Sequence, residues 1–215
     1  MLSDPTPFRS ARATAACSTR CLLSGVRGAD LGGHKVLIIG AAGGVGTFAV
    51  QIAKAFGAHV TGVCSTTKAD LVRSIGADEV IDYTRDDFAG GGRRYDVILD
   101  TAGNRSLSQL RRALSPRGTL VIVGGEGGGK WTGGFDRALW ALMLSPFVGQ
   151  KLSALVSGEN AADLLVLKEH IEAGKVTPVI EKTYPLSDAA EAIRHLADGH
   201  ARGKLVVTVS AGGSD

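Results

Sequence analysis

The sequence predicts an α/β fold built on a doubly wound parallel sheet, with helices on both faces, and three observations support this. From Lys35 onward, short apolar runs alternate with segments whose apolar residues recur at helical spacing, which is the pattern of strands joined by helices. The predicted strands are apolar at consecutive positions, as strands buried on both faces are. A glycine-rich turn directly follows the first strand.

Each element is predicted by its local pattern. The run Val36 to Ile39 forms the first strand, and Val45 to Phe56 forms a helix that Gly57 ends. Further strands are predicted at residues 59–64, 80–81, 97–99, 119–123, 179–184 and 204–209, and further helices at residues 69–75, 106–114, 136–144, 161–173 and 188–197. The stretch Gly124 to Gly134 is predicted to be a loop.

The first part of the chain, residues 1–34, lacks this periodicity. Arginines are scattered there among Ala and Ser, with one early acid at Asp4. We expect a disordered or non-native leader. An organelle transit peptide is the alternative, although Pro5 and Pro7 do little to support the amphipathic helix that such a peptide needs.

Composition argues against a nucleic-acid partner and a membrane span, and it indicates a cellular compartment. The chain of 215 residues is 44% hydrophobic with a net charge of +3, so we expect a globular domain with no nucleic-acid partner. Its longest apolar stretch, Ala138 to Val148, is shorter than the roughly 18 residues that a membrane span needs. The three cysteines predict free thiols in a reducing, cytoplasmic compartment.

The Cys and His residues do not form a metal-ligand pattern. Cys17 and Cys21 have a spacing that could supply two zinc ligands, but no second pair and no nearby His complete the set. The five histidines are scattered along the chain. We therefore expect no zinc.

The glycine-rich turn predicts a dinucleotide site. Gly43, Gly44, Val45 and Gly46 lie between the first strand and the first helix. Glycines there let the backbone N–H groups at the helix N-terminus approach a pyrophosphate. The first glycine of the usual G-x-G-x-x-G pattern is replaced by Ala41, and the strand-turn-helix context supports the Rossmann interpretation over an ordinary turn.

The end of the second strand predicts which dinucleotide is bound. An Asp or Glu about 20 residues after the glycines would bind the ribose hydroxyls of NADH, and the sequence has Ser65 to Lys68 at that point. Hydroxyls and an ammonium suit the 2'-phosphate of NADPH, which a carboxylate would repel. We expect NADPH in preference to NADH.

Three stretches resemble one known family. The strings VLIIGAAGGVGTFAVQIAKAFGAHV, GADEVIDY and YDVILDTAG are similar to the medium-chain dehydrogenase and reductase superfamily of zinc-type alcohol dehydrogenases and quinone oxidoreductases. The tail IEAGKVTPVIEKTYPLSDAAEAIRHLADGHARGKLVV resembles its zinc-independent quinone reductase branch. The resemblance implies hydride transfer between NADPH and a small quinone, enone, alcohol or carbonyl compound.

The resemblance also implies roles for single residues. Gly43 to Gly46 would hold the pyrophosphate, and Ser65, Lys68 and Tyr83 would surround the adenosine ribose and its phosphate. Thr101, Val123 and Gly124, at strand ends, would face the adenine, ribose or nicotinamide, and Arg202 could reach the cofactor from the tail. No catalytic residue is implied.

The resemblance divides the chain into three parts. Residues 1–34 are the leader, residues 35–175 the NAD(P)-binding Rossmann domain, and residues 176–215 a strand-helix-strand tail that normally completes the sheet of a catalytic domain. That domain is expected to be missing, as in a truncated or frame-disrupted gene product. We then expect the two tail strands to lack partners and to favour association, with a second copy or with a separate catalytic domain.

Two functions remain open from the sequence. One is the oxidoreductase, and the alternative is a non-catalytic NADPH-binding remnant or partner-binding module. A short-chain dehydrogenase is excluded because no Tyr is followed by Lys four positions later. A methyltransferase usually has an acid at the end of the second strand, where this chain has none.

Overall fold

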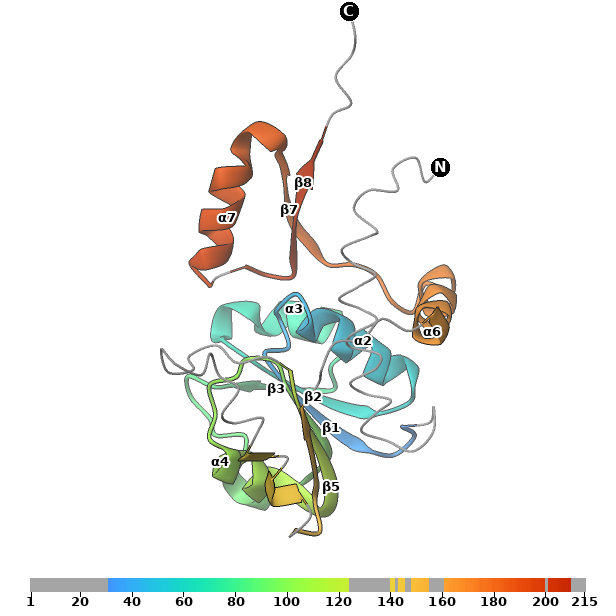
Figure 1. Ribbon diagram of the computed structural model, residues 1–215, viewed down its shortest axis with the longest axis vertical. Coiled ribbons are helices and arrows are strands. Elements are labelled where there is room, and N and C mark those ends of the chain that lie inside the picture. Colours follow the sequence, from blue (N-terminus) through green and yellow to red (C-terminus); the bar gives the residue numbers. More distant parts are fainter. Residues whose placement is uncertain are drawn as a thin grey trace, which may run out of the picture.

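The fold is a parallel sheet with helices on both faces, joined to a smaller two-stranded tail (Figure 1). The computed structural model describes residues 31–123, 140–141, 143–145, 148–154, 161–199 and 201–209. Within these residues, six strands form the main sheet in the order β3-β2-β1-β4-β5-β6. They are β1 Lys35–Ile39, β2 His59–Cys64, β3 Glu79–Asp82, β4 Tyr95–Asp100, β5 Leu114–Ile122 and β6 Lys151–Ala154.

Helices cover both faces of this sheet, as the sequence pattern predicted. They are α2 Gly46–Ala55, α3 Ala69–Ser74, α4 Leu107–Ala113 and α6 Ala161–Glu172. In Figure 1, α2 and α3 lie on one face and α4 lies on the other. None of the helices in the described ranges is long and apolar enough to cross a membrane.

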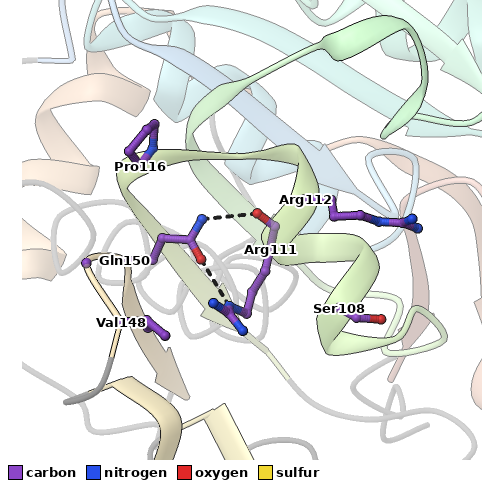
Figure 2. A pocket seen from close by; sticks show the side chains of 7 residues that line it. Ser108, Arg111, Arg112, Pro116, Val148 and Gln150 are labelled. Atoms are coloured by element: carbon purple, nitrogen blue, oxygen red, sulfur yellow. Dashed lines mark hydrogen bonds between the residues drawn. The ribbon is translucent and has the colours of Figure 1, made fainter.

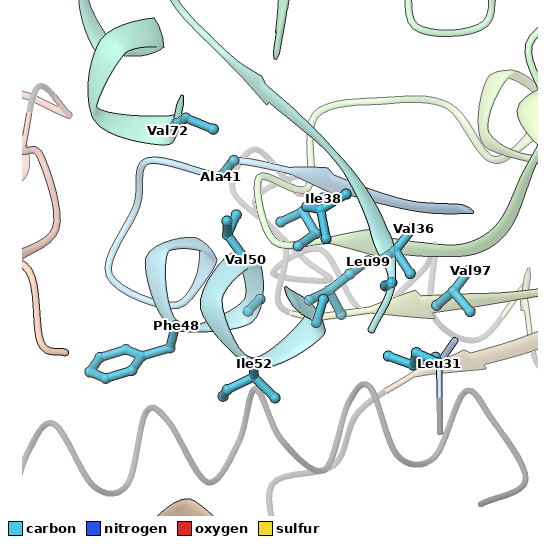
Figure 3. Packing of buried hydrophobic residues seen from close by; sticks show 14 of the residues in the cluster. Leu31, Val36, Ile38, Ala41, Phe48, Val50, Ile52, Val72, Val97 and Leu99 are labelled. Atoms are coloured by element: carbon cyan, nitrogen blue, oxygen red, sulfur yellow. The ribbon is translucent and has the colours of Figure 1, made fainter. Parts of the chain in front are cut away.

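Alternation along β1 builds the two apolar cores. Val36 and Ile38 belong to the same buried core as Phe48, Val50 and Ile52 of α2 on one face (Figure 3). Successive side chains of a strand point to opposite faces, so Leu37 and Ile39 pack in the core beneath α4. Because both faces are covered, β1 is apolar at four consecutive positions.

The folded part begins before the predicted boundary at residue 34. The Leu31 side chain is only 2% exposed and belongs to the α2 core. Its backbone N–H donates to the carbonyl of Phe56 at 3.0 Å. Residues 1–30 lie outside the described residues, so the structure bears on the predicted leader only from Leu31 onward.

Two strands differ from the prediction. β5 begins at Leu114, the last residue of the helix predicted at 106–114, and includes Pro116 and Gly118 ahead of the strand predicted at 119–123. The strand accommodates them because its register with β4 shifts between Tyr95 and Val97. β6 was not predicted, because Lys151–Ala154 is short and has no β-branched residue. The predicted helix at residues 136–144 lies mostly outside the described residues.

The tail strands are paired with each other, so the expectation that they lack partners is wrong. β7, Ile180–Pro185, and β8, Lys204–Thr208, form a parallel pair separate from the main sheet. Along the chain, the helix α7, Ala189–Ala197, connects the two strands. Neither strand joins the Rossmann sheet in the described part of the chain, and the assignment of the tail to a catalytic domain stays a prediction.

A buried glutamine joins the tail to the Rossmann sheet. Gln51 of α2 is 8% exposed. Its Nε2 donates to the carbonyl of Thr177 at 3.0 Å, and its Oε1 accepts from the Thr177 N–H at 2.8 Å. The side chain thus pairs with one backbone residue just before β7, as a neighbouring strand would.

We predict that Gln51→Leu loosens this junction. Leucine keeps the volume but makes neither hydrogen bond, and each such bond contributes about 1 kcal/mol net. We expect the free energy of unfolding to fall by about 1–2 kcal/mol and the Thr177 amide to exchange faster with solvent. Hydrogen exchange measures this, with the amide of Leu99 as internal control. Unchanged exchange at Thr177 would contradict the assigned role.

Candidate functional site

The carboxyl ends of the parallel strands gather the predicted site residues at one edge of the sheet. β1 pairs with both β2 and β4 in parallel register. The chain moves from β1 to β2 in one direction and from β4 to β5 in the other. Ligands of open α/β sheets bind at such a reversal point, beyond the carboxyl ends of the strands.

The glycine loop occupies this edge and leads directly into α2. Gly40 has a φ of +83°, which is accessible to glycine, and its carbonyl accepts from the Gly43 N–H at 3.0 Å. A Cβ on Gly46 would lie 2.1 Å from the Gly40 oxygen and 2.8 Å from Ala41 backbone atoms. Only glycine lets the first turn of α2 lie this close to the loop. The predicted site at Gly43 to Gly46 is therefore at the strand ends.

The loop after β4 lies against the glycine loop. The Thr101 hydroxyl donates to the carbonyl of Ile39 at 2.8 Å, and a Cβ on Gly40 would lie 2.5 Å from this hydroxyl. The buried Asp100 carboxylate accepts from the Gly103 N–H at 3.0 Å and shapes this turn. Val123 follows β5 and donates its N–H to the Asp100 carbonyl at 2.9 Å.

Two of the predicted site residues, Thr101 and Val123, are therefore brought together through Asp100, which the sequence reasoning missed. Gly124 lies outside the described residues. The sequence signal that could have identified Asp100 is its position as an acid directly after the apolar run Val97 to Leu99.

The end of β2 forms the second part of the site. A short 3-10 turn, Thr66–Lys68, follows Ser65. The N–H of Tyr83 donates to the Cys64 carbonyl at 3.1 Å, which brings the end of β3 to this corner. The Tyr83 ring is 49% exposed, and the Arg105 guanidinium lies 6.0 Å from its centroid. Ser65, Lys68 and Tyr83 thus lie at adjacent strand ends, while their predicted role around the ribose stays a prediction.

An acid missed by the sequence reasoning, Asp82, also reaches this corner. Thr66 donates its hydroxyl to Asp82, and the Thr84 hydroxyl donates at 2.7 Å. The hydrogen bond from Thr66, followed by those from Thr84, lowers the pKa of Asp82 below its ordinary value. The carboxylate is therefore ionised at neutral pH. The parallel register of β2 and β3 places Asp82 beside Cys64, which no local sequence pattern indicates.

The turn before β8 closes onto the same edge. Lys68 Nζ donates to the Ala201 carbonyl at 3.0 Å. The Gly203 N–H donates to the Ala42 carbonyl at 3.0 Å. Arg202 lies between these contacts, with its side chain exposed and its N–H donating to Glu181 Oε2 at 2.7 Å. The tail therefore brings Arg202 to the glycine loop, far from it in sequence.

The thiol and metal-ligand residues give no reactive centre in the described ranges. Burial, followed by the Asp82 carboxylate, raises the pKa of Cys64, so the thiol stays protonated at neutral pH. No group of three His, Cys, Asp or Glu residues able to hold a metal exists among the described residues. Cys17 and Cys21 lie outside them.

A hollow of about 520 Å³ lies between α4, the start of β5 and the residues just before β6 (Figure 2). It is lined by Ser108, Arg111, Arg112, Pro116, Val148, Gly149 and Gln150. The Arg111 Nε donates to Gln150 Oε1 at 3.1 Å, while Gln150 Nε2 donates to the Arg111 carbonyl at 3.0 Å. It contains none of the predicted site residues.

Comparison with known proteins agrees with this geometry. Residues 75–207 match the family model described as zinc-binding dehydrogenase. The chain belongs to the zinc-binding dehydrogenase family. This confirms the resemblance to the medium-chain alcohol dehydrogenases and quinone oxidoreductases. The family's description concerns the family as a whole, and our expectation of no zinc in this chain stays a prediction.

The relatives are oxidoreductases. The mitochondrial NAD(P)H oxidoreductase RTN4IP1 of Mus musculus is 35% identical over 209 residues, covering 82% of this chain and 48% of the relative. The chloroplastic quinone-oxidoreductase QR1 of Triphysaria versicolor is 37% identical over 185 residues, covering 82% and 53%. The chain thus spans about half the length of these relatives.

A solved structure shows the same fold. The quinone oxidoreductase from Coxiella burnetii superposes with a TM-score of 0.76 at 25% identity, covering 91% of this chain and 58% of that chain. The prediction of a Rossmann fold of the medium-chain type is therefore confirmed.

We predict that Gly46→Ala destabilises the loop and abolishes dinucleotide binding. The new Cβ would meet backbone atoms that cannot rotate away, and overpacking of this kind costs about 1–3 kcal/mol. Urea denaturation and NADPH titration measure the two effects. Gly44→Ala is the matched control for stability, because its Cβ would meet only the end of the Lys204 side chain, at 3.0 Å. Equal stability of the two variants would refute the assignment.

Proposed function

We propose that the chain is the nucleotide-binding part of an NADPH-dependent oxidoreductase that acts on a quinone, enone, alcohol or carbonyl compound. The observation that carries this proposal is the contact of Gly46 with the loop after β1, where a Cβ would lie 2.1 Å from the Gly40 oxygen. The oxidoreductase names of the relatives support it over the non-catalytic alternative.

The residues at the sheet edge fit a dinucleotide. The glycine loop leads directly into the N-terminus of α2, whose first turn contains no acidic residue. Backbone N–H groups and the positive end of the helix dipole favour a pyrophosphate there. Thr101 and Val123, on the neighbouring strand ends, would orient the nicotinamide half, and a bound NADPH supplies the hydride.

The side chains after β2 favour NADPH over NADH in this proposal. Ser65 and Lys68 supply a hydroxyl and an ammonium for a 2'-phosphate, and Tyr83 supplies an exposed ring beside them. The Asp82 charge opposes this preference. Thr66 and Thr84 donate hydrogen bonds to that carboxylate and keep it ionised. In this proposal Lys68, whose Nζ also donates to the Ala201 carbonyl, is the cation that offsets it.

We also propose the partners and the place of action. Residues 35–175 form the NAD(P)-binding domain, and residues 176–215 complete the sheet of a catalytic domain supplied by the other half of such proteins. β6 is an edge strand that pairs with β5 alone among the described strands, so a homo-oligomer could form there.

A reducing compartment suits a buried, protonated Cys64. The cytoplasm is one such place, while the RTN4IP1 relative is mitochondrial.

We predict that NADPH binds more tightly than NADH and that Ser65→Asp reverses or erases the difference. A carboxylate at this position repels a 2'-phosphate and accepts a hydrogen bond from a 2'-hydroxyl. Fluorescence titration with both nucleotides measures the ratio. Ser65→Asn is the control, because asparagine has the shape of aspartate without its charge, and this variant should retain the preference for NADPH. Equal affinities in the parent chain would overturn the NADPH assignment.

We predict that the 215-residue chain binds NADPH but reduces quinones and enones slowly by itself. Hydride transfer needs donor and acceptor carbons about 3–3.5 Å apart in a held orientation, and the relatives contain about as much chain again. The loss of NADPH absorbance measures turnover, alone and after addition of the N-terminal half of a relative. Rapid turnover by the chain alone would contradict the prediction.

A further inference from the structure

A second concave region, the hollow lined by Arg111 and Gln150, lies away from the predicted dinucleotide site. Its volume of about 520 Å³ is within the range of small-ligand pockets. Its lining includes Pro116, near the start of β5, and Gly149, just before β6. The hollow is therefore at the amino ends of these parallel strands, whereas the glycine loop is at the carboxyl end of β1.

Two arginines of α4 line the hollow, and none of the described residues that line it is acidic. Arg111 is half-buried and Arg112 is exposed. Neither guanidinium forms an ion pair with a carboxylate in the described part of the chain. Because a guanidinium keeps its positive charge at physiological pH, the hollow attracts anions.

Gln150 holds Arg111 in place before any ligand is bound. Its Oε1 accepts from the Arg111 Nε at 3.1 Å, while its Nε2 donates to the Arg111 carbonyl at 3.0 Å. Figure 2 shows the two side chains directed at each other. This contact uses only the Nε of Arg111, and the Nη groups are the remaining donors for a ligand. A side chain that is already fixed loses less entropy when it binds.

Further cations lie at the same strand ends. Arg117 is exposed in the first part of β5. Arg93 and Arg94, both exposed, directly precede β4, and the pairing of Tyr95 with Leu114 brings them to the start of β5. A concave surface surrounded by charges of one sign concentrates ligands of the opposite sign.

The acid at these strand ends, Asp96, already has hydrogen-bond partners. Its Oδ1 accepts from the Ser115 hydroxyl and its Oδ2 from the Lys35 N–H, both at 3.0 Å. The carboxylate thus joins β4 to β1 and β5, and it does not line the hollow.

We propose that the hollow binds a phosphate monoester, with its phosphate on Arg111 and Arg112. Guanidinium groups match phosphate oxygens through two parallel hydrogen bonds. Pro116 and Val148 give the lining an apolar part, which suits the organic group of the ester. The ester comes either from a free small molecule or from a lipid headgroup. This site is separate from the proposed dinucleotide site and does not depend on it.

Two probes distinguish these sources. Phenyl phosphate represents a free monoester and is titrated against the 215-residue chain by calorimetry. Phosphatidylcholine vesicles with and without phosphatidic acid present the same group on a lipid, and co-sedimentation measures binding to them. The variants are Arg111→Gln and Arg112→Gln. The matched control is Arg73→Gln, because Arg73 pairs with Asp70 on α3, on the other face of the sheet.

We expect each α4 variant to weaken phenyl phosphate binding about tenfold, the effect of losing one charge-assisted hydrogen bond. Arg112→Lys should restore only part of the affinity, since an ammonium cannot form two parallel bonds. Arg73→Gln and Lys68→Met should stay within about twofold of the parent. The affinity for NADPH and the melting temperature should be unchanged in Arg112→Gln. Binding only to phosphatidic acid vesicles, lost in Arg112→Gln, would support the site with a lipid as its ligand.

Three outcomes would overturn the proposal. The first is a parent chain that binds neither phenyl phosphate nor the phosphatidic acid vesicles. The second is an α4 variant that melts at a lower temperature but binds the probe as the parent does, because the arginines then only balance the end of the helix. The third is equal weakening by Lys68→Met and Arg112→Gln, which would place the probe in the dinucleotide site. A failure of NADPH binding alone would refute the proposed function and leave this inference standing.

Discussion

The contact between the first turn of α2 and the loop after β1 is the constraint on which the rest of the site depends. At Gly46 there is no room for even one methyl group between helix and loop. This closeness directs the start of α2 at the space beyond the strand ends. The same helix buries Phe48 and Ile52 in the core that covers β1 and β2, so hydrophobic burial keeps the loop in place.

The parallel sheet gives the site its other residues. Because all its strands run in one direction, the residues that follow β1, β2, β4 and β5 meet at one edge. Backbone hydrogen bonds then tie the strand ends together, as between Val123 and Asp100. Side chains that are distant in sequence therefore become neighbours, although no local sequence pattern indicates their contact.

The tail adds a second layer to this edge. It does not extend the Rossmann sheet, yet it is fastened to α2 through Gln51 and Thr177 and to the glycine loop through Gly203. A segment that forms its own strand pair thus reaches the place where a dinucleotide would bind. These contacts couple the position of the tail to the geometry of the glycine loop.

Much of the fold followed from local patterns. The apolar run Val36 to Ile39 and the helical stripe after it predicted β1 and α2 to within one residue at most boundaries, because strongly periodic burial leaves a clear trace in sequence. β6 could not be predicted, since Lys151–Ala154 becomes a strand only by pairing with β5. The bulged start of β5 was also missed, because a register shift depends on the neighbouring strand.

The sequence by itself determined the fold class, the position of the glycine loop and the hydroxyl and ammonium groups after β2, since each depends on residues that are adjacent in the chain. Only the tertiary structure decided that Asp82 reaches the same corner as Ser65, that β7 and β8 pair with each other, and that Lys204 lies over Gly44. These contacts join residues far apart in the chain, and their formation depends on how the strands pair and how the tail docks, which no local pattern contains.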